Sequence, residues 1–186
     1  LYASDSKLTT NNAEAYYASL KGQIGAATLG ADYVHSAKYT ATVTAGNTSY
    51  DGINVWGANL NVPAGDFAVF GDYYKNTKKI TGTYDKPAFY TAGLAYGSTV
   101  ASKPGTFRIG AQYVKAETGS YFGGTTMQVD PMSLTYSYKG LDNVKYWLAT
   151  ADVMLMKNVR LHGEYAFNVK GDNRDGGSTD FDDVAT

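Results

Sequence analysis

The sequence contains no cysteine and only four prolines among its 186 residues. Without cysteine there is neither a disulfide framework nor a thiolate metal site. Long hydrophobic runs are also missing, because the most apolar stretch, residues 147–156, contains Thr150 and Asp152. A transmembrane helix needs about 18 or more consecutive apolar residues. Any membrane-spanning segment of this chain must therefore be a strand.

An excess of either charge is lacking, since 16 basic and 17 acidic residues are interspersed along the chain. No basic stripe of the kind that binds phosphate backbones is present, so nucleic acid is not an expected partner. Residues 1–10 lack a basic start followed by an apolar stretch. They do not form a signal peptide, and we expect either that one has been removed or that the chain begins inside a longer protein.

Glycine and tyrosine are abundant, with 21 and 17 copies. They combine in a short pattern in which a glycine is followed by a polar residue and a tyrosine. Tyr33, Tyr73 and Tyr113 of this pattern lie 40 residues apart. That interval fits two strands of about ten residues with one long loop. The four copies are Gly30-Ala31-Asp32-Tyr33, Gly71-Asp72-Tyr73, Gly110-Ala111-Gln112-Tyr113 and Gly163-Glu164-Tyr165.

Apolar and other residues alternate with a period of two around each copy, and between the copies as well. This period predicts strands with one apolar face and one polar or mixed face. The tail from Phe181 resumes the alternation and predicts the start of a ninth strand. The eight complete strands are expected around residues 16–20, 27–34, 56–62, 66–73, 90–96, 107–114, 147–153 and 159–167.

The predicted connections alternate between short and long, which is typical of an up-and-down membrane barrel. Short links are expected at 22–25, 63–65, 97–105 and 156–158, and long polar links at 37–52, 76–87, 116–143 and 169–180. With the short links at the periplasmic end, one tyrosine or tryptophan of each strand falls near the outer end. Such rings favour the headgroup region of a membrane. This predicted aromatic girdle comprises Tyr16, Tyr33, Trp56, Tyr73, Tyr90, Tyr113, Trp147 and Tyr165.

The expected fold is therefore all-β, an antiparallel up-and-down transmembrane β-barrel, with residues 1–186 as one segment. Single-chain bacterial barrels have even strand numbers. Eight complete strands followed by the start of a ninth therefore indicate a segment of about eight to nine strands from a larger barrel. A soluble β-sandwich binding module and a propeller are the alternatives. A propeller blade needs four short strands in each repeat, whereas this repeat fits two long ones.

The polar faces of the predicted strands carry several charges. Inside a soluble core each unpaired charge would cost several kcal/mol, whereas in a water-filled lumen it costs little and contributes to ion selectivity. Gating by ion concentration is an alternative role for these charges. The predicted pore-lining residues are Asp32, Asp72, Arg108, Gln112, Asp152, Arg160, His162 and Glu164.

The link 116–143 is longer than two adjacent strands require, and long loops in compact proteins usually have a function. Its apolar side chains, Met127 and Val129 among them, should bury against another part of the protein. We therefore expect it to fold into the barrel mouth as a constriction loop with Tyr121, Phe122 and Asp130. The alternative is a rigid extracellular rim, since residues 132–138 also alternate.

Catalytic and metal-binding patterns are weak. His162 and Glu164 share a strand face, and Ser133 or Ser137 could complete a lipase-like triad, but no serine occupies a strained nucleophile elbow. The acidic stretches 172–177 and 180–183 lack the ligand spacing of a helix-loop-helix calcium site. Neither an enzyme nor a cofactor is expected.

Three short motifs of the sequence resemble those of a known protein family. Gly119-Ser120-Tyr121-Phe122, Lys157-Asn158-Val159-Arg160-Leu161-His162-Gly163-Glu164-Tyr165 and Asp180-Phe181-Asp182-Asp183 resemble the barrel part of outer-membrane porins that carry an N-terminal S-layer-homology domain. The resemblance implies a passive channel for ions and small hydrophilic solutes in the bacterial outer membrane. It also implies a homotrimer in contact with lipid and lipopolysaccharide, and tethering to peptidoglycan or another cell-wall polymer through a preceding domain.

This chain departs from that family in two ways. It shows no S-layer-homology segment before Leu1, and it ends without the terminal aromatic residue that such barrels present. Both departures fit a segment from the later part of a larger barrel. The second functional hypothesis is a non-conducting structural barrel that anchors the outer membrane to the cell wall.

Overall fold

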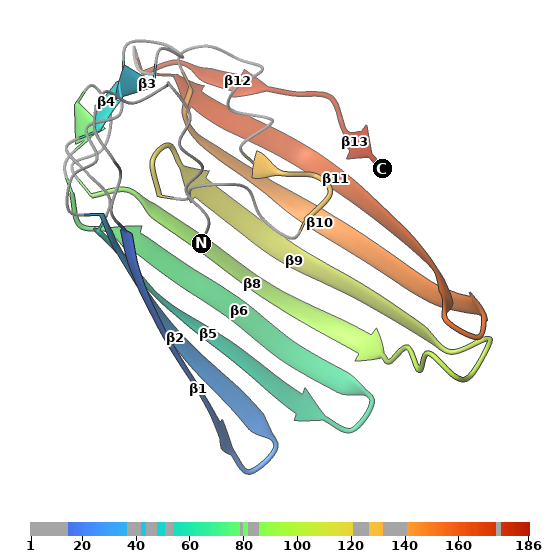
Figure 1. Cartoon of the computed structure of the whole chain (residues 1–186). Coiled ribbons are helices and arrows are strands. Elements are labelled where there is room, and N and C mark those ends of the chain that lie inside the picture. Colours follow the sequence, from blue (N-terminus) through green and yellow to red (C-terminus); the bar gives the residue numbers. More distant parts are fainter. Residues whose placement is uncertain are drawn as a thin grey trace, which may run out of the picture.

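The computed structural model describes residues 15–36, 42–43, 48–50, 54–78, 80–81, 86–120, 127–131, 141–173 and 176–186. Within these residues eight long strands pair in chain order, each antiparallel to the next, and two short strands extend the sheet beyond the last of them (Figure 1). The long strands are β1 (Ala15–Ile24), β2 (Ala27–Ser36), β5 (Asn54–Ala64), β6 (Phe67–Asn76), β8 (Ala88–Gly97), β9 (Phe107–Glu117), β10 (Leu141–Met156) and β11 (Val159–Asn173).

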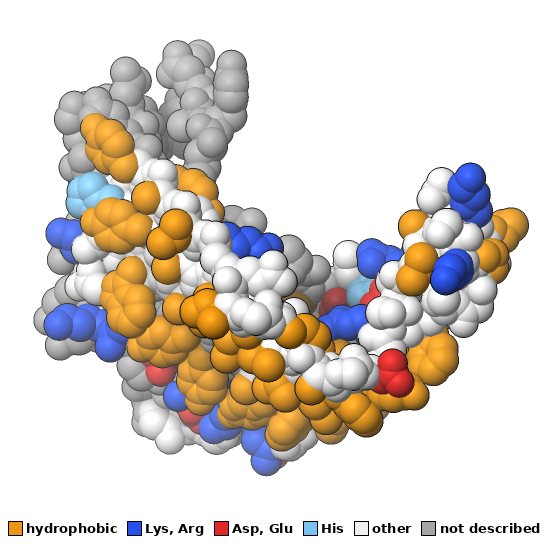
Figure 2. All heavy atoms as spheres, turned by 90° about the horizontal axis from the view of Figure 1, so that it is seen from below, with side chains coloured by type: hydrophobic (Ala, Val, Ile, Leu, Met, Phe, Trp, Pro, Cys, Tyr) orange, Lys and Arg blue, Asp and Glu red, His pale blue; other side chains and the backbone are white. Residues whose placement is uncertain are grey.

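The predicted all-β, antiparallel up-and-down architecture is confirmed, because each expected strand is present and pairs with its neighbours in sequence. The sheet curves into an open trough, with hydrophobic side chains gathered along its outer side (Figure 2). One edge of the described sheet is β1, which pairs with β2. The opposite edge is formed by β11 and its two short partners. Closure of the sheet into a barrel remains a prediction.

Three of the short links are two-residue hairpins, since Met156 also pairs with Val159 across Lys157 and Asn158. In the first two a glycine occupies the first central position, with φ of 60° at Gly25 and 64° at Gly65, as a type II′ turn requires. The predicted links 22–25 and 63–65 began too early, because Gly22 and Pro63 still pair in the ladder, with Leu29 and Ala68. A single left-handed glycine suffices for each of these two turns, and in the third the left-handed residue is Asn158, at φ 62°.

The first two long links are joined by a small sheet of their own. Its strands are β3 (Thr42–Val43), β4 (Thr48–Tyr50) and β7 (Ile80–Thr81). Strand β4 from the first link pairs with β7 from the second, with Ser49 opposite Thr81. The sequence predicted both links as loops without strands. The pairing of β4 with β7 connects the link between β2 and β5 to the link between β6 and β8, at the end of the sheet where the long links lie, here called the loop end.

The last strand of the sheet begins earlier than predicted. Strands β12 (Ser178–Asp180) and β13 (Val184–Ala185) pair with β11 in one continuous register, so pairing starts at Ser178 and not at Phe181. The sequence interpretation ended the preceding strand too soon because Asn168, at φ 54°, interrupts the alternation. Beyond this irregularity β11 continues to Asn173.

The two faces of the sheet are inverted relative to a soluble sandwich. On the convex face large apolar side chains are exposed, with Leu94 50%, Ile109 49% and Leu161 56% accessible. Most of the buried apolar side chains lie instead on the concave face, clustered at the loop end of β8 to β11. This concave cluster consists of Phe89, Val114, Ala116, Val129, Val144, Tyr146, Leu148, Ala166 and Val169. No helix among the described residues has the length and hydropathy needed to cross a membrane.

Candidate functional site

The predicted aromatic girdle lies on the convex face near the loop end of the sheet. Neighbouring strands bring its rings together, because Tyr33 is opposite Trp56 and Tyr73 is opposite Tyr90. Ring centroids are 5.4 Å apart for Trp56 and Tyr73, and 6.2 Å apart for Tyr90 and Tyr113. The row continues through β10, where Trp147 lies 5.4 Å from Tyr113. At its two ends are Tyr16, opposite His35 on β2, and Tyr165, opposite Ala149 on β10.

A second aromatic group, which the sequence interpretation missed, lies on the same face near the short turns. Tyr96 lies 5.0 Å from Phe67 and 6.2 Å from Phe107, measured between ring centroids. Phe67 and Tyr73 are six residues apart on β6, which corresponds to roughly 20 Å of strand. The signal was present in the sequence, because Phe67 and Phe107 begin their strands with the same parity as Tyr73 and Tyr113.

The concave face carries the polar side chains, in two groups. The first surrounds Asp32 on β2, which accepts hydrogen bonds from the hydroxyls of Tyr17 at 2.9 Å and Tyr74 at 3.0 Å. Asn59 Nδ2 donates a third bond at 3.3 Å. The carboxylate is thereby held by three strands besides its own.

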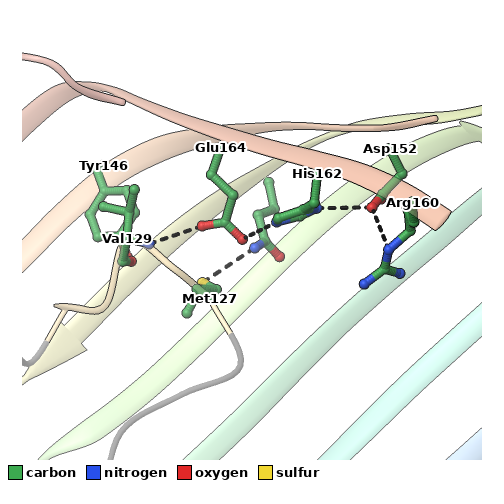
Figure 3. A network of polar contacts seen from close by, with 8 residues as sticks. Met127, Val129, Tyr146, Asp152, Arg160, His162 and Glu164 are labelled. Carbon is green, nitrogen blue, oxygen red and sulfur yellow. Dashed lines mark hydrogen bonds and ion pairs between the residues drawn. The ribbon is translucent and has the colours of Figure 1, made fainter. Parts of the chain in front are cut away.

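The second group is a row of ionisable side chains on β10 and β11 (Figure 3). Arg160 Nε lies 3.4 Å from Asp152 Oδ1, and His162 Nδ1 lies 2.9 Å from the same oxygen. On the other side of the ring, His162 Nε2 lies 3.1 Å from Glu164 Oε1. Both carboxylates are buried, whereas Arg160 is exposed. The row therefore runs from solvent at its Arg160 end to the buried Glu164.

The remaining predicted pore-lining residues also lie on the concave face. Arg108 is 5.5 Å from the centroid of the Phe70 ring, within the range of a cation–π contact. Asp72 accepts a hydrogen bond from the hydroxyl of Thr91 at 2.7 Å. All eight predicted residues thus share one face, and their role in lining a channel remains a prediction.

One stretch of the long link 116–143 folds onto this concave face. Val129 is only 3% exposed and packs in the concave cluster, where Met127 joins it. Its backbone N–H donates to Glu164 Oε2 at 2.9 Å, and its carbonyl accepts from the Tyr146 hydroxyl at 2.9 Å. Of the predicted constriction residues, Asp130 lies in this stretch, half-buried. Tyr121 and Phe122 lie outside the described residues.

Apolar residues at the loop end of the concave face were not expected from the sequence. Val114, Tyr146 and Leu148 are almost completely buried there. Their signal was a run in which both strand faces are apolar, as in Tyr146-Trp147-Leu148-Ala149. Such a run indicates that both faces are covered. Here the concave side is covered by the stretch around Val129.

Catalytic chemistry at His162 finds no support in the described part of the chain. Both ring nitrogens face carboxylates, so neither faces a hydroxyl nucleophile as a triad requires. Ser133 and Ser137 lie outside the described residues. Groups of three or more histidine and acidic side chains able to hold a metal ion are not found among the residues described.

Comparison with protein-family models and with curated proteins finds no match. A functional assignment must therefore come from the geometry of the two faces.

Proposed function

We propose that this chain forms part of the wall of a passive, water-filled channel in a membrane. The observation that carries the proposal is the inversion of the sheet, with large apolar side chains exposed on the convex face and ionisable side chains on the concave face. In water an apolar surface of this extent would favour aggregation or partner binding. Against lipid tails it needs no partner.

The two aromatic groups support the same orientation. The girdle near the loop end and the group around Tyr96 near the short turns bracket the apolar convex face. Rings with polar tips favour the headgroup region, so two such rows mark the two borders of a hydrocarbon layer. On β10 the outward-facing positions from Trp147 to Leu155 extend over eight residues, or roughly 27 Å of strand.

The concave face would supply the aqueous path. Its described basic side chains, Lys21, Arg108 and Arg160, share this face with Asp32, Asp72, Asp152 and Glu164. Rings of charged side chains of both signs are used to select ions and small hydrophilic solutes. In a closed barrel these groups would surround the permeating solute.

Further parts of the proposal come from the family resemblance. These are closure into a larger barrel, residence in the bacterial outer membrane with lipid and lipopolysaccharide as neighbours, a homotrimer, and attachment to peptidoglycan or another cell-wall polymer through a preceding domain.

A structural, non-conducting barrel is a second candidate. The observation that favours it is the concave cluster, because Val129 and Met127 fill part of the space that a channel would need. Such a barrel would anchor the membrane without passing solute.

Single-channel recording of the intact protein in planar bilayers separates the two functions. A channel gives stepwise current increments with a uniform unitary conductance, and heat-denatured protein gives none. Folded, membrane-inserted protein without such increments would favour the anchor. Protein that remains soluble without detergent would instead favour a β-sandwich binding module.

A further inference from the structure

The stretch Met127–Pro131, here called the inner segment, is held to the concave wall by side chains from three strands. Gln112 Nε2 of β9 lies 3.3 Å from the Met127 sulfur. The Tyr146 hydroxyl of β10 donates to the Val129 carbonyl, and Glu164 of β11 accepts from the Val129 N–H. Both main-chain polar groups of one residue are therefore bound by side chains of the wall.

Tyr146 and Glu164 are suited to hold a segment in one place. Tyr146 is 1% exposed and Glu164 6% exposed, so neither side chain is free to swing into solvent. A buried main-chain group left without a partner is costly. Any shift of Val129 along the wall would leave two such groups unpaired at once.

The row on β10 and β11 fixes the orientation of the Glu164 carboxylate (Figure 3). Its Oε1 faces His162, and its Oε2 accepts from Val129. His162 in turn faces Asp152, which is paired with Arg160. A chain of polar contacts therefore links the exposed lower concave face to the backbone of the inner segment.

We propose that Tyr146 and Glu164 form a two-point clamp on Val129 that positions the inner segment and thereby sets the free aperture of the channel. His162 and Asp152 act as positioning residues for Glu164. The aperture part of this inference rests on the proposed channel function, whereas the clamp itself does not.

The chain's lack of cysteine allows a direct test. In full-length Val129→Cys protein the main-chain bonds of position 129 are retained, and the buried thiol reacts with an aqueous methanethiosulfonate reagent only when the segment leaves the wall. The labelling rate then reports the undocked population. Tyr146→Phe removes one hydroxyl, and Glu164→Gln removes the charge while keeping the size. Tyr96→Phe, the same loss of a hydroxyl on the convex face, is the matched control.

Tyr146→Phe should raise the labelling rate about two- to tenfold, as expected for the loss of one neutral hydrogen bond. Glu164→Gln should raise it by a similar factor, about two- to tenfold, because the amide oxygen can still accept but the charge that strengthens the bond is lost. Tyr96→Phe should leave the rate unchanged. Heat-modifiable migration in detergent electrophoresis shows which variants are folded, and Tyr146→Phe is conservative enough to remain informative if Glu164→Gln fails to fold. Rates equal to those of Tyr96→Phe would overturn the clamp.

Single-channel recordings of the same variants without the Val129→Cys change test the aperture. Released segments should produce current fluctuations that the parent protein and Tyr96→Phe lack. Faster labelling with unaltered current in a conducting protein would overturn the link to the aperture. A parent protein that is inserted but does not conduct would overturn the channel function, while the labelling rates would still decide the clamp.

Discussion

Two glycines on the concave face make room for aromatic rings of the adjacent strand. Gly57 is paired with Tyr74, and Gly93 is paired with Phe70. A Cβ at position 57 would lie 2.1 Å from Tyr74 Cδ1, and one at position 93 would lie 2.6 Å from Phe70 Cζ. The absence of a side chain at each glycine therefore lets the ring lie across the strand, and from this position Tyr74 reaches Asp32.

Gly57→Ala should consequently destabilise the protein, because the new methyl group displaces Tyr74 and removes its bond to Asp32. Overpacking of this kind typically costs about 1–3 kcal/mol. Gly22→Ala is the matched control, since a Cβ there meets nothing within 4 Å. Urea unfolding in detergent, followed by tyrosine and tryptophan fluorescence, measures the difference. Equal midpoints for the two variants would show that Tyr74 does not depend on Gly57.

Arg108 and Arg160 provide a residue-scale test of the aqueous path. Replacing both with glutamate should raise cation preference in reversal-potential measurements at low salt, where screening is weak. The control is Lys157→Glu, the same type of charge change at an exposed residue in the turn between β10 and β11. An ion preference indistinguishable from the parent's would place the arginines away from permeating ions.

At the scale of elements, the period-two pattern was sufficient to predict all eight long strands, because each contains a long stretch of regular alternation. The pattern failed where alternation is locally interrupted. Asn168 in β11 adopts φ 54°, and the sequence shows no glycine there to indicate it. The small sheet of β3, β4 and β7 was also not predictable, since its short strands pair between links that are distant in sequence.

For the candidate site on the concave face, too, one part could be predicted from the sequence and another part could not. The residues that face inward follow from strand parity, and all eight predicted pore-lining residues lie there. Their partners do not follow from parity, because Tyr74 reaches Asp32 across β5, and Glu164 binds a backbone group of a loop. Such contacts depend on the curvature of the sheet and on the course of the link 116–143.

That link supplies an element-scale prediction. Deleting Ser120 to Val129 from the intact protein should raise unitary conductance and the size limit for solutes, because the deletion removes the part of the inner segment bound by Glu164. A rigid extracellular rim would leave both quantities unchanged. Parent values of conductance and solute cut-off, in protein that still folds, would therefore favour the rim.

At the scale of the whole molecule, the structure is one curved, antiparallel up-and-down sheet, with the described strands β1 and β11–β13 at its edges. Its stability cannot come from a core on the convex side, where the large apolar groups are exposed. The proposed function needs lipid on that side and water on the other. The function stands or falls with this division between the two faces.

The two tryptophans report directly on what covers the convex face, because Trp56 and Trp147 are the only ones in the chain and both lie exposed in the girdle. In bilayers of the intact protein, their fluorescence should be quenched by lipids brominated at shallow acyl positions and less by lipids brominated near the chain ends. Aqueous iodide should have little effect. Strong quenching by iodide with no effect of any brominated lipid would show that the convex face meets water and that this sheet is not part of a membrane channel.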